Sequence, residues 1–312
     1  MRAVTIVDGA LEWREHPDPV PGRGELLVAV HAAGVNNADL IQRAGFYPAP
    51  AGSPADIPGL ELAGEVVATG DGVERFAPGD RVMAVVGGGA QAELAVVPER
   101  HALPVPPRMP WAEAGGFPEA FTTAHDALFT QCGLRLGERA CVHGAAGGVG
   151  AAGVQLAVAA GATVVATVRD PARREAVRAF GAVVVDPGEF TAHGPFDVIL
   201  ELVGAPNFPA DLDALAVSGR IAVIGTGAGS KVELDLLRLM HKRARIHGST
   251  LRARSLEDKA VAARAVEHQV LPLLASGRVR VPVQATFAMA DATAAYEQFA
   301  AGGKFGKLVL LA

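Results

Sequence analysis

Cysteine is scarce in this chain: among 312 residues, only Cys132 and Cys141 occur. Two thiols are too few for a disulfide framework or a cysteine-based metal site, which excludes the disulfide-rich secreted scaffolds and favours a reducing, cytoplasmic location. Aromatic residues are also few, at 5%, whereas half of all residues are hydrophobic. This composition suits layered α/β packing, and the length predicts two domains.

The chain also lacks an excess of positive charge, because 28 Lys and Arg are outnumbered by 33 Asp and Glu, giving a formal net charge of −5. This balance argues against nucleic acid as a partner. No basic and aromatic stripe indicates a surface for single-stranded RNA. Only a short apolar run follows Arg2, so we expect no signal peptide.

Charged residues are missing altogether between Cys141 and Val168, a run long enough to suggest a membrane span of about 20 residues. Six glycines interrupt the run, and its periodicity changes from strand to helix to strand. A buried parallel strand, a helix and a second strand explain it better. We therefore expect a soluble protein with no membrane partner.

The order of elements predicts two kinds of domain. Between Glu25 and Val97, short strands are punctuated by Gly and Pro, which is typical of a small β-rich domain. From Phe121 onward, strands alternate with helices as far as Leu251. Such alternation predicts a doubly wound parallel sheet whose ligand lies beyond the carboxyl ends of its strands.

A glycine-rich loop from Gly144 to Gly150 lies between the strand that ends at His143 and an apolar helix. Small residues let the backbone approach a pyrophosphate, and the N–H groups at the start of the helix face the anion. The strand, loop and helix context therefore predicts a dinucleotide site, although Ala145 replaces the first glycine of the strict motif. The predicted contacts in this loop are Ala146, Gly147, Gly148, Val149 and Gly150.

The cofactor is expected to be NADPH. An NAD enzyme usually places an acid at the end of the second strand, but here Val168 and Arg169 occupy that end. The next acid, Asp170, precedes a proline and is expected to cap a helix. Arg173 and Arg174, one turn further on, join Arg169 in a basic cluster suited to a 2′-phosphate.

Several further motifs run along the whole chain: Ala33–Leu40, Gly45–Pro48, Pro58–Val66, Ala145–Gly150 with Val154–Ala157, and Gly306-Lys307. Together they resemble the medium-chain dehydrogenase/reductase superfamily and, within it, the zinc-free quinone oxidoreductases related to ζ-crystallin. Gly87–Ala92 and Gly248–Arg252 look closest to the p53-inducible branch of that family. The resemblance implies a GroES-like catalytic domain (residues 1–119 and 254–312), a Rossmann domain (120–253), and a homodimer.

The chain departs from the zinc-dependent relatives at two positions. Asn36 replaces a cysteine ligand, and Leu60, in Gly59-Leu60-Glu61, replaces the histidine of a Gly-His-Glu triplet. An amide and a hydrocarbon cannot hold Zn²⁺ tetrahedrally, so no metal is expected. Without a Lewis acid, reduction of an electron-poor acceptor is favoured over oxidation of an alcohol.

The resemblance also implies roles for individual residues. Asn36 is expected to donate a hydrogen bond to the substrate oxygen, and Tyr47 to line the substrate pocket. Ile41 stands where relatives often carry a second tyrosine. Further cofactor contacts are expected at Thr123, with Thr122 as the alternative, and at Gly225 and Thr226. Asp39 and Glu61 are expected to be structural, and His125 and His143 to be packing or capping residues.

These features predict an NADPH:quinone reductase that transfers hydride to a quinone or an α,β-unsaturated carbonyl without metal. An enoyl-thioester or 2-alkenal reductase on the same scaffold remains an alternative, because the same hydride chemistry applies. A third alternative is an NADPH-binding sensor or structural protein with little turnover, since the fold alone does not determine function.

Overall fold

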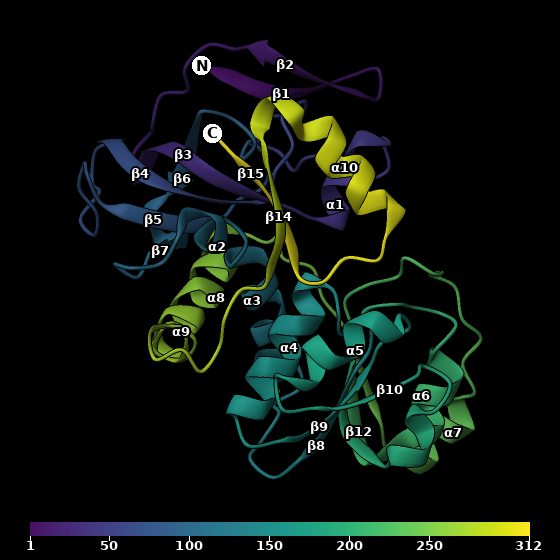
Figure 1. Ribbon diagram of the computed structural model, residues 1–312. Coiled ribbons are helices and arrows are strands. Elements are labelled where there is room, and N and C mark those ends of the chain that lie inside the picture. The colour runs from purple at the N-terminus through teal and green to yellow at the C-terminus, as the bar shows by residue number, and fades with distance from the viewer. The chain divides into compact units, whose positions relative to one another are not determined.

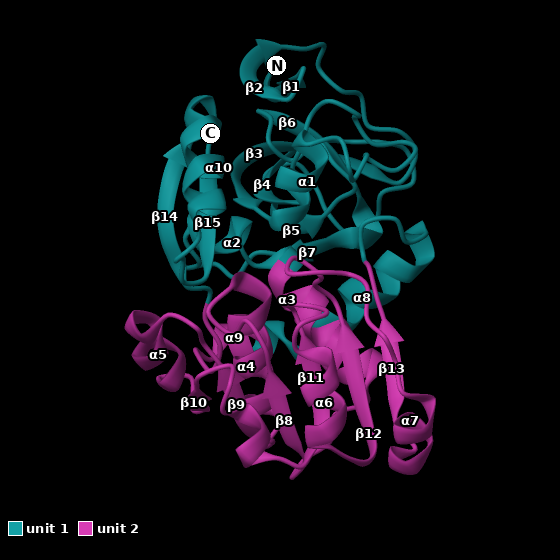
Figure 2. Ribbon diagram, turned by 90° about the vertical axis from the view of Figure 1, so that its right-hand side faces the viewer, with its two compact units in different colours: residues 1–119, 251–272, 281–312 teal, residues 120–250, 273–280 magenta.

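The computed structural model describes residues 1–312 and divides into two compact units. The first unit comprises residues 1–119, 251–272 and 281–312, and the second comprises 120–250 and 273–280 (Figure 2). The chain passes between the units at four points, and two of them lie within short helices, α3 (Pro118–His125) and α9 (Leu271–Ala275). No helix is long and apolar enough to cross a membrane.

The first unit is built on a seven-stranded sheet in the order β14-β15-β3-β4-β5-β7, with β6 also paired to β3 (Figure 1). All of its pairings are antiparallel except that of β14 with β15. A separate antiparallel pair, β1 with β2, was not expected from the sequence. The strands are β1 (Arg2–Val7), β2 (Ala10–Glu15), β3 (Glu25–Val35), β4 (Glu61–Thr69), β5 (Arg81–Val85), β6 (Leu94–Pro98), β7 (Ala102–Pro104), β14 (Val283–Ala288) and β15 (Lys307–Leu311).

Alternating apolar side chains explain how this sheet buries one face. In β3, Leu26, Val28 and Val30 are buried, and they pack with Leu308 of β15 and Tyr296 in one core. Tyr296 belongs to α10, which lies along β14 and β15 (Figure 1). The helices of this unit are α1 (Asn37–Arg43), α2 (Trp111–Gly115), α8 (Leu256–Gln269) and α10 (Ala292–Ala301).

The second unit contains the expected doubly wound sheet, in the order β10-β9-β8-β11-β12-β13 and parallel throughout. The expected mixed α/β fold class, a β-rich unit together with a doubly wound parallel sheet, is confirmed. Strands are β8 (Arg139–Val142), β9 (Thr163–Thr167), β10 (Val183–Val185), β11 (Phe196–Glu201), β12 (Leu215–Val223) and β13 (Arg245–Gly248). Helices are α4 (Gly148–Ala159), α5 (Pro171–Arg178), α6 (Phe208–Ala214) and α7 (Leu236–Lys242), and a π-helical segment runs from Asp126 to Gln131.

One expected helix is divided. The pattern from Leu256 to Ala275 predicts a single helix, but α8 ends at Gln269 and α9 begins at Leu271. Pro272 explains the break, because its ring lacks an N–H and clashes with the preceding turn of a continuous helix.

Candidate active site

The glycine-rich loop leads from the end of β8 into α4. Gly147 is the N-cap of α4, and no side chain caps this helix. A Cβ atom on Gly150 would lie 2.4 Å from the carbonyl oxygen of Gly144, so only glycine fits there. The loop therefore turns as tightly as a dinucleotide site requires, and the uncapped N–H groups of α4 are available to an anion.

Two predicted cofactor contacts, Gly225 and Thr226, follow β12, where the backbone comes close to the segment after β11. A Cβ atom on Gly225 would lie 2.4 Å from the carbonyl oxygen of Leu202, in the segment that follows β11. Thr226 comes next, at the carboxyl end of the parallel sheet. Thr122 and Thr123 lie on α3, and both are buried.

The end of β9 carries the residues predicted to select the cofactor. Asp170 caps α5, as expected, by accepting from the N–H of Ala172 at 3.0 Å. The Arg174 guanidinium is not free to bind a cofactor phosphate, because it donates to the carbonyl of Val168 and to Asp186. Arg169 is exposed, and Arg173 makes only a 3.5 Å ion pair with Asp170. Two arginines are thus available here, beside a carboxylate that is engaged as a cap.

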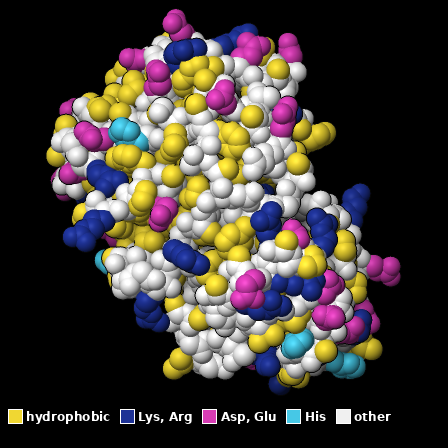
Figure 3. Space-filling model, viewed as in Figure 1, with side chains coloured by type: hydrophobic (Ala, Val, Ile, Leu, Met, Phe, Trp, Pro, Cys, Tyr) yellow, Lys and Arg dark blue, Asp and Glu magenta, His cyan; other side chains and the backbone are white.

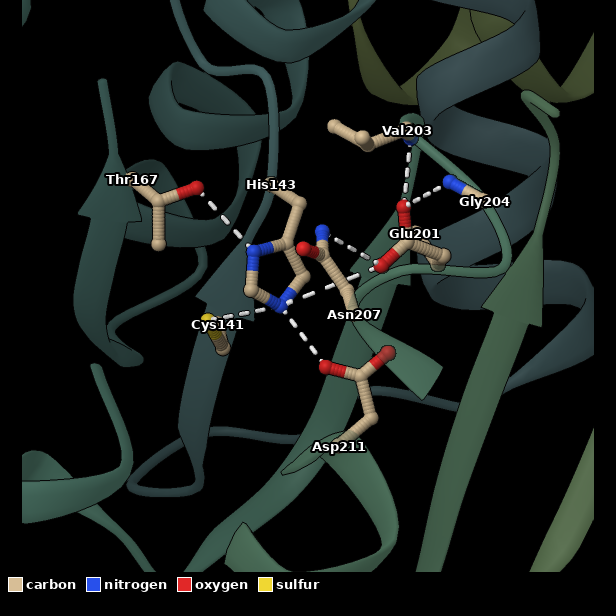
Figure 4. Close-up of polar contacts among 8 residues, drawn as sticks. All are labelled: Cys141, His143, Thr167, Glu201, Val203, Gly204, Asn207 and Asp211. Carbon is tan, nitrogen blue, oxygen red and sulfur yellow. Dashed lines mark hydrogen bonds and ion pairs between the residues drawn. The ribbon is translucent and has the colours of Figure 1, made fainter. Parts of the chain in front are cut away.

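A buried charged cluster lies at the same end of the sheet (Figure 4). His143 Nε2 is 2.9 Å from Asp211 Oδ1 and 4.0 Å from Glu201 Oε2, and all three side chains have no exposed surface. His143 Nδ1 bonds the Thr167 hydroxyl at 3.0 Å. The cluster therefore joins the ends of β8, β9 and β11 to α6.

Glu201 extends this cluster into the loop after β11. Its Oε1 accepts from the N–H groups of Val203 and Gly204, and its Oε2 accepts from Asn207 at 3.0 Å (Figure 4). Burial raises the pKa of Glu201, and the charge on His143 and the backbone N–H donors lower it, because they stabilise the carboxylate form. Through its hydrogen bonds, Glu201 fixes the segment that approaches Gly225.

The charge on His143 depends on its neighbours. Burial lowers the pKa of His143, but Cys141 and the hydrogen-bonded Asp211 raise it by more, and the pKa reaches about 11. A charged imidazole donates from both nitrogens, which fits the contacts of Nδ1 with the Thr167 hydroxyl and of Nε2 with Asp211 Oδ1. From the sequence, His143 was expected to be a packing or capping residue, and the cluster was not foreseen. Its only local sign is Asp211, a buried acid on α6, and the second aspartate of this helix, Asp213, hides it in the pattern.

In the first unit, three polar side chains meet where β3, β4 and β15 come together. The Lys307 ammonium lies 2.5 Å from Glu61 Oε1 and 2.7 Å from Asn36 Oδ1. Asn36 Nδ2 in turn donates to Glu61 Oε1 at 2.9 Å. Glu61 and Lys307 are 0% and 4% exposed. Because the amide oxygen faces a cation and its nitrogen faces a carboxylate, Asn36 is held in one orientation.

Asp39 and Glu61 also bind the backbone, as the sequence analysis expected. Asp39 accepts from the N–H groups of Asn36 and Gly59, and burial raises the pKa of Asp39 to about 7. Glu61 accepts from the N–H of Glu119 at 2.8 Å. The ion pair of Glu61 with Lys307 was not foreseen, although Lys307 belongs to a motif noted in the sequence.

Tyr47 lies in the loop after α1, partly buried, with the Arg252 guanidinium 5.0 Å from the centre of its ring. Burial raises the pKa of Tyr47, and Arg252 lowers it by a smaller amount. Asn36 and Tyr47 thus flank the two ends of α1 (Asn37–Arg43).

Comparison with known proteins gives consistent results for both units. Residues 22–107 match the family described as alcohol dehydrogenase GroES-like domain, and residues 148–267 match zinc-binding dehydrogenase. A quinone oxidoreductase of Pseudomonas aeruginosa is 31% identical, with 96% of this chain and 95% of the relative covered. The polyketide synthase protein NorB of Streptomyces orinoci is 35% identical over 97% of this chain, which corresponds to 14% of NorB.

Among solved structures, a mycobacterial protein, Rv1454c, complexed with NADPH has a TM-score of 0.88 at 28% sequence identity. The match covers all of both chains. Each unit of the present chain therefore has counterparts in known oxidoreductases.

The first prediction concerns the buried ion pair. Lys307→Met leaves the Glu61 carboxylate buried without its cation, so the free energy of unfolding should fall by about 3–5 kcal/mol. Adding Glu61→Gln should restore most of this loss, because the neutral pair has no buried charge. Urea unfolding of both variants measures the effect; a double variant no more stable than Lys307→Met would contradict it.

The second prediction concerns the pH dependence of stability. The folded-state pKa of His143 lies above the unfolded value, so its contribution is complete below about pH 6.5 and is lost as pH rises toward about 11. The loss is at most about 1.4 kcal/mol per pH unit. Asp211→Asn keeps the shape but removes the carboxylate, so the wild type's advantage over this variant should shrink from pH 7 to pH 10. Urea unfolding at each pH measures it; a constant difference would show that His143 is neutral.

Proposed function

Because the chain belongs to the medium-chain dehydrogenase/reductase family, among its quinone oxidoreductases, we propose that it is an NADPH-dependent reductase of quinones or α,β-unsaturated carbonyls that works without zinc. One observation carries the proposal: Lys307 donates to both Glu61 and Asn36, and Asn36 stands where the zinc-dependent relatives carry a cysteine ligand. Such a set of donors does not fit a zinc ion. One position is a leucine, one is a neutral amide, and the carboxylate already has a cation.

The reaction follows from what the residues can supply. Bound NADPH supplies a hydride from its nicotinamide ring. The Asn36 amide is fixed by Lys307 and Glu61, and the second Nδ2 proton has only a 3.5 Å contact to the Gly34 carbonyl. That proton can be donated to an acceptor oxygen on which negative charge develops. The proton that completes the reduction comes from water, and Tyr47 packs against the acceptor ring.

The cofactor proposal rests on the end of β9. Asp170 Oδ1 caps α5 and Oδ2 faces Arg173 at 3.5 Å, so both oxygens already have donors that compete with a ribose hydroxyl. Arg169 and Arg173 supply the charge that a 2′-phosphate requires. The solved neighbour complexed with NADPH supports the same assignment.

A second function, reduction of an enoyl thioester or a 2-alkenal, is favoured by the similarity to NorB, which is a polyketide synthase protein. The third alternative, an NADPH-binding protein with little turnover, uses the same cofactor contacts. Lys and Arg are interspersed with Asp and Glu on the face seen in Figure 3, which fits a small-molecule substrate better than a nucleic acid. We also propose that the protein acts in a reducing, cytoplasmic compartment, because both cysteines are free and buried.

We further propose a homodimer that forms through the edge strand β13. This strand pairs only with β12, and α7 beside it exposes Leu236, Leu237 and Met240. An unpaired edge next to exposed apolar residues is suited to pairing with a second copy across a two-fold axis. Light scattering should give a mass of twice 32.0 kDa. A mass of one chain would reject the dimer.

The deciding experiment follows NADPH or NADH oxidation by absorbance at 340 nm, with a small quinone, an enal and a crotonyl thioester tested in parallel. Rapid oxidation of NADPH with the quinone or the enal supports the proposal. Faster turnover of the crotonyl thioester favours the second function. Measurable NADPH binding without turnover of any acceptor would establish the third.

Cofactor preference gives a further prediction. Arg173→Ala removes a charge-assisted contact worth about 1–3 kcal/mol, so the KM for NADPH should rise about 5- to 150-fold. The KM for NADH should change by less than about 2-fold, because NADH has no 2′-phosphate. Steady-state kinetics with both cofactors measure the change. Arg178→Ala on the same helix is the matched control, since Arg178 pairs only with the exposed Glu175; equal effects of Arg173→Ala on both cofactors would contradict the assignment.

A further inference from the structure

Arg252 is a buried arginine in the first unit to which the proposed reaction assigns no role. It lies in the segment between β13 and α8 and is only 3% exposed. Its guanidinium donates in three directions: to the carbonyl of Gly87 at 2.7 Å, to the carbonyl of Tyr47 at 2.9 Å, and to Gln42 Oε1 at 2.5 Å. One side chain thus joins three segments that are distant in the sequence.

The partners of Arg252 are unusual for a buried cation. None of the three acceptors is a carboxylate, whereas buried arginines normally pair with one. The remaining contact is with the Tyr47 ring, whose centre lies 5.0 Å from the guanidinium carbon. A cation over an aromatic face is attracted by the ring, so Arg252 holds both the main chain and the side chain of Tyr47.

The three segments that Arg252 joins contain Gln42, Tyr47 and Gly87, and in the proposed function they surround the acceptor. Gln42 lies on α1, whose preceding residue is Asn36, and its amide also donates to the Ala55 carbonyl at 3.1 Å. Gly87 begins a glycine tip that packs against the same loop, since a Cβ atom there would lie 2.2 Å from Ser53 Oγ. The loop from residue 45 to 55 is therefore held by Arg252 at one end and by Gln42 at the other.

We propose that Arg252 is a positioning residue for the acceptor, which sets the Tyr47 ring and the Gly87 tip in one arrangement through its three-way hydrogen bonding. This inference rests on the proposed function, because it assumes that Tyr47 contacts the acceptor. A lysine at this position would keep the charge but could not reach three acceptors in the plane of a guanidinium. The planar arrangement of the guanidinium N–H groups, rather than the positive charge alone, is therefore what holds the three segments together.

The test compares Arg252→Lys and Arg252→Met with the wild type in the quinone assay. Losing well-aligned charged hydrogen bonds should lower kcat/KM for the quinone by about 10-fold or more in both variants. The Kd for NADPH, measured by fluorescence titration, should change by less than about 2-fold, because Arg252 contacts none of the predicted cofactor residues. Full activity in Arg252→Lys would overturn the proposal.

The matched control is Arg220→Lys. Arg220 is also buried and donates to the carbonyls of Cys132 and Gly133 and to Glu138, all in the second unit. This variant should lose thermal stability comparable to that lost by Arg252→Lys and keep kcat/KM for the quinone within about 2-fold. If both variants lose activity in proportion to stability, Arg252 has only a structural role and the proposal fails.

Tyr47→Ala separates positioning from general damage. If Arg252 acts through the tyrosine, Arg252→Met should lower kcat/KM by less than about 2-fold in the Tyr47→Ala background. The same loss in both backgrounds would show that Arg252 does not act through Tyr47. If Tyr47→Phe and Tyr47→Ala both keep full activity, Tyr47 has no role in reduction of the acceptor.

Hydrogen–deuterium exchange tests whether Arg252 holds the two loops in place without measuring enzymatic turnover. Arg252→Met, or Arg252→Lys if the former does not fold, should accelerate exchange in residues 45–55 and 85–91 and leave residues 140–160 unchanged. If no acceptor is reduced by the wild type but this pattern is seen, the proposed function fails while the positioning contact stands. Unchanged exchange in both loops would overturn the inference whatever the activity.

Discussion

The first unit depends on the buried ion pair between Lys307 and Glu61. Glu61 accepts from the Lys307 ammonium, the Asn36 amide and the Glu119 N–H, so one carboxylate joins the end of β3, the start of β4, β15 and the start of α3. Removing either charge leaves the other without compensation in a place that water does not reach. The pair therefore fixes where these elements meet, and with them the orientation of the Asn36 amide.

The second unit uses the same physical solution at the ends of its parallel strands. His143, Asp211 and Glu201 are fully buried, and Glu201 binds the backbone N–H groups of the loop after β11, close to Gly225. Glycines allow that approach but hold nothing, because they have no side chain to pack. The Phe190 ring packs edge-on against His143, with 4.6 Å between the ring centres. The loop after β11 is held by the hydrogen bonds that Glu201 accepts.

Sequence patterns predicted the parts of the fold that depend on periodicity and turns. The alternation of strands and helices after Phe121, the glycine loop before α4 and the Asp170 cap all follow from local rules, and the structure contains them. The contacts of Arg252 and Lys307 could not be predicted in this way. Each joins residues more than 160 positions apart, and no local pattern distinguishes a buried arginine or lysine from an exposed one. The His143 cluster escaped for the same reason.

The arrangement of charge around Asn36 limits the chemistry that the proposed function can include. A metal would polarise a substrate oxygen strongly, whereas a neutral amide that is already bound on both sides offers one remaining proton. Such a donor suits an acceptor that is electrophilic before it binds, and both a quinone and an enoyl thioester meet this condition. In each case, the hydride adds to carbon or oxygen of a conjugated system and the charge arrives on an oxygen. The acceptor classes differ in shape, so in the proposed site the pocket walls assigned to Tyr47 and Gly87, which Arg252 binds, would have to distinguish them.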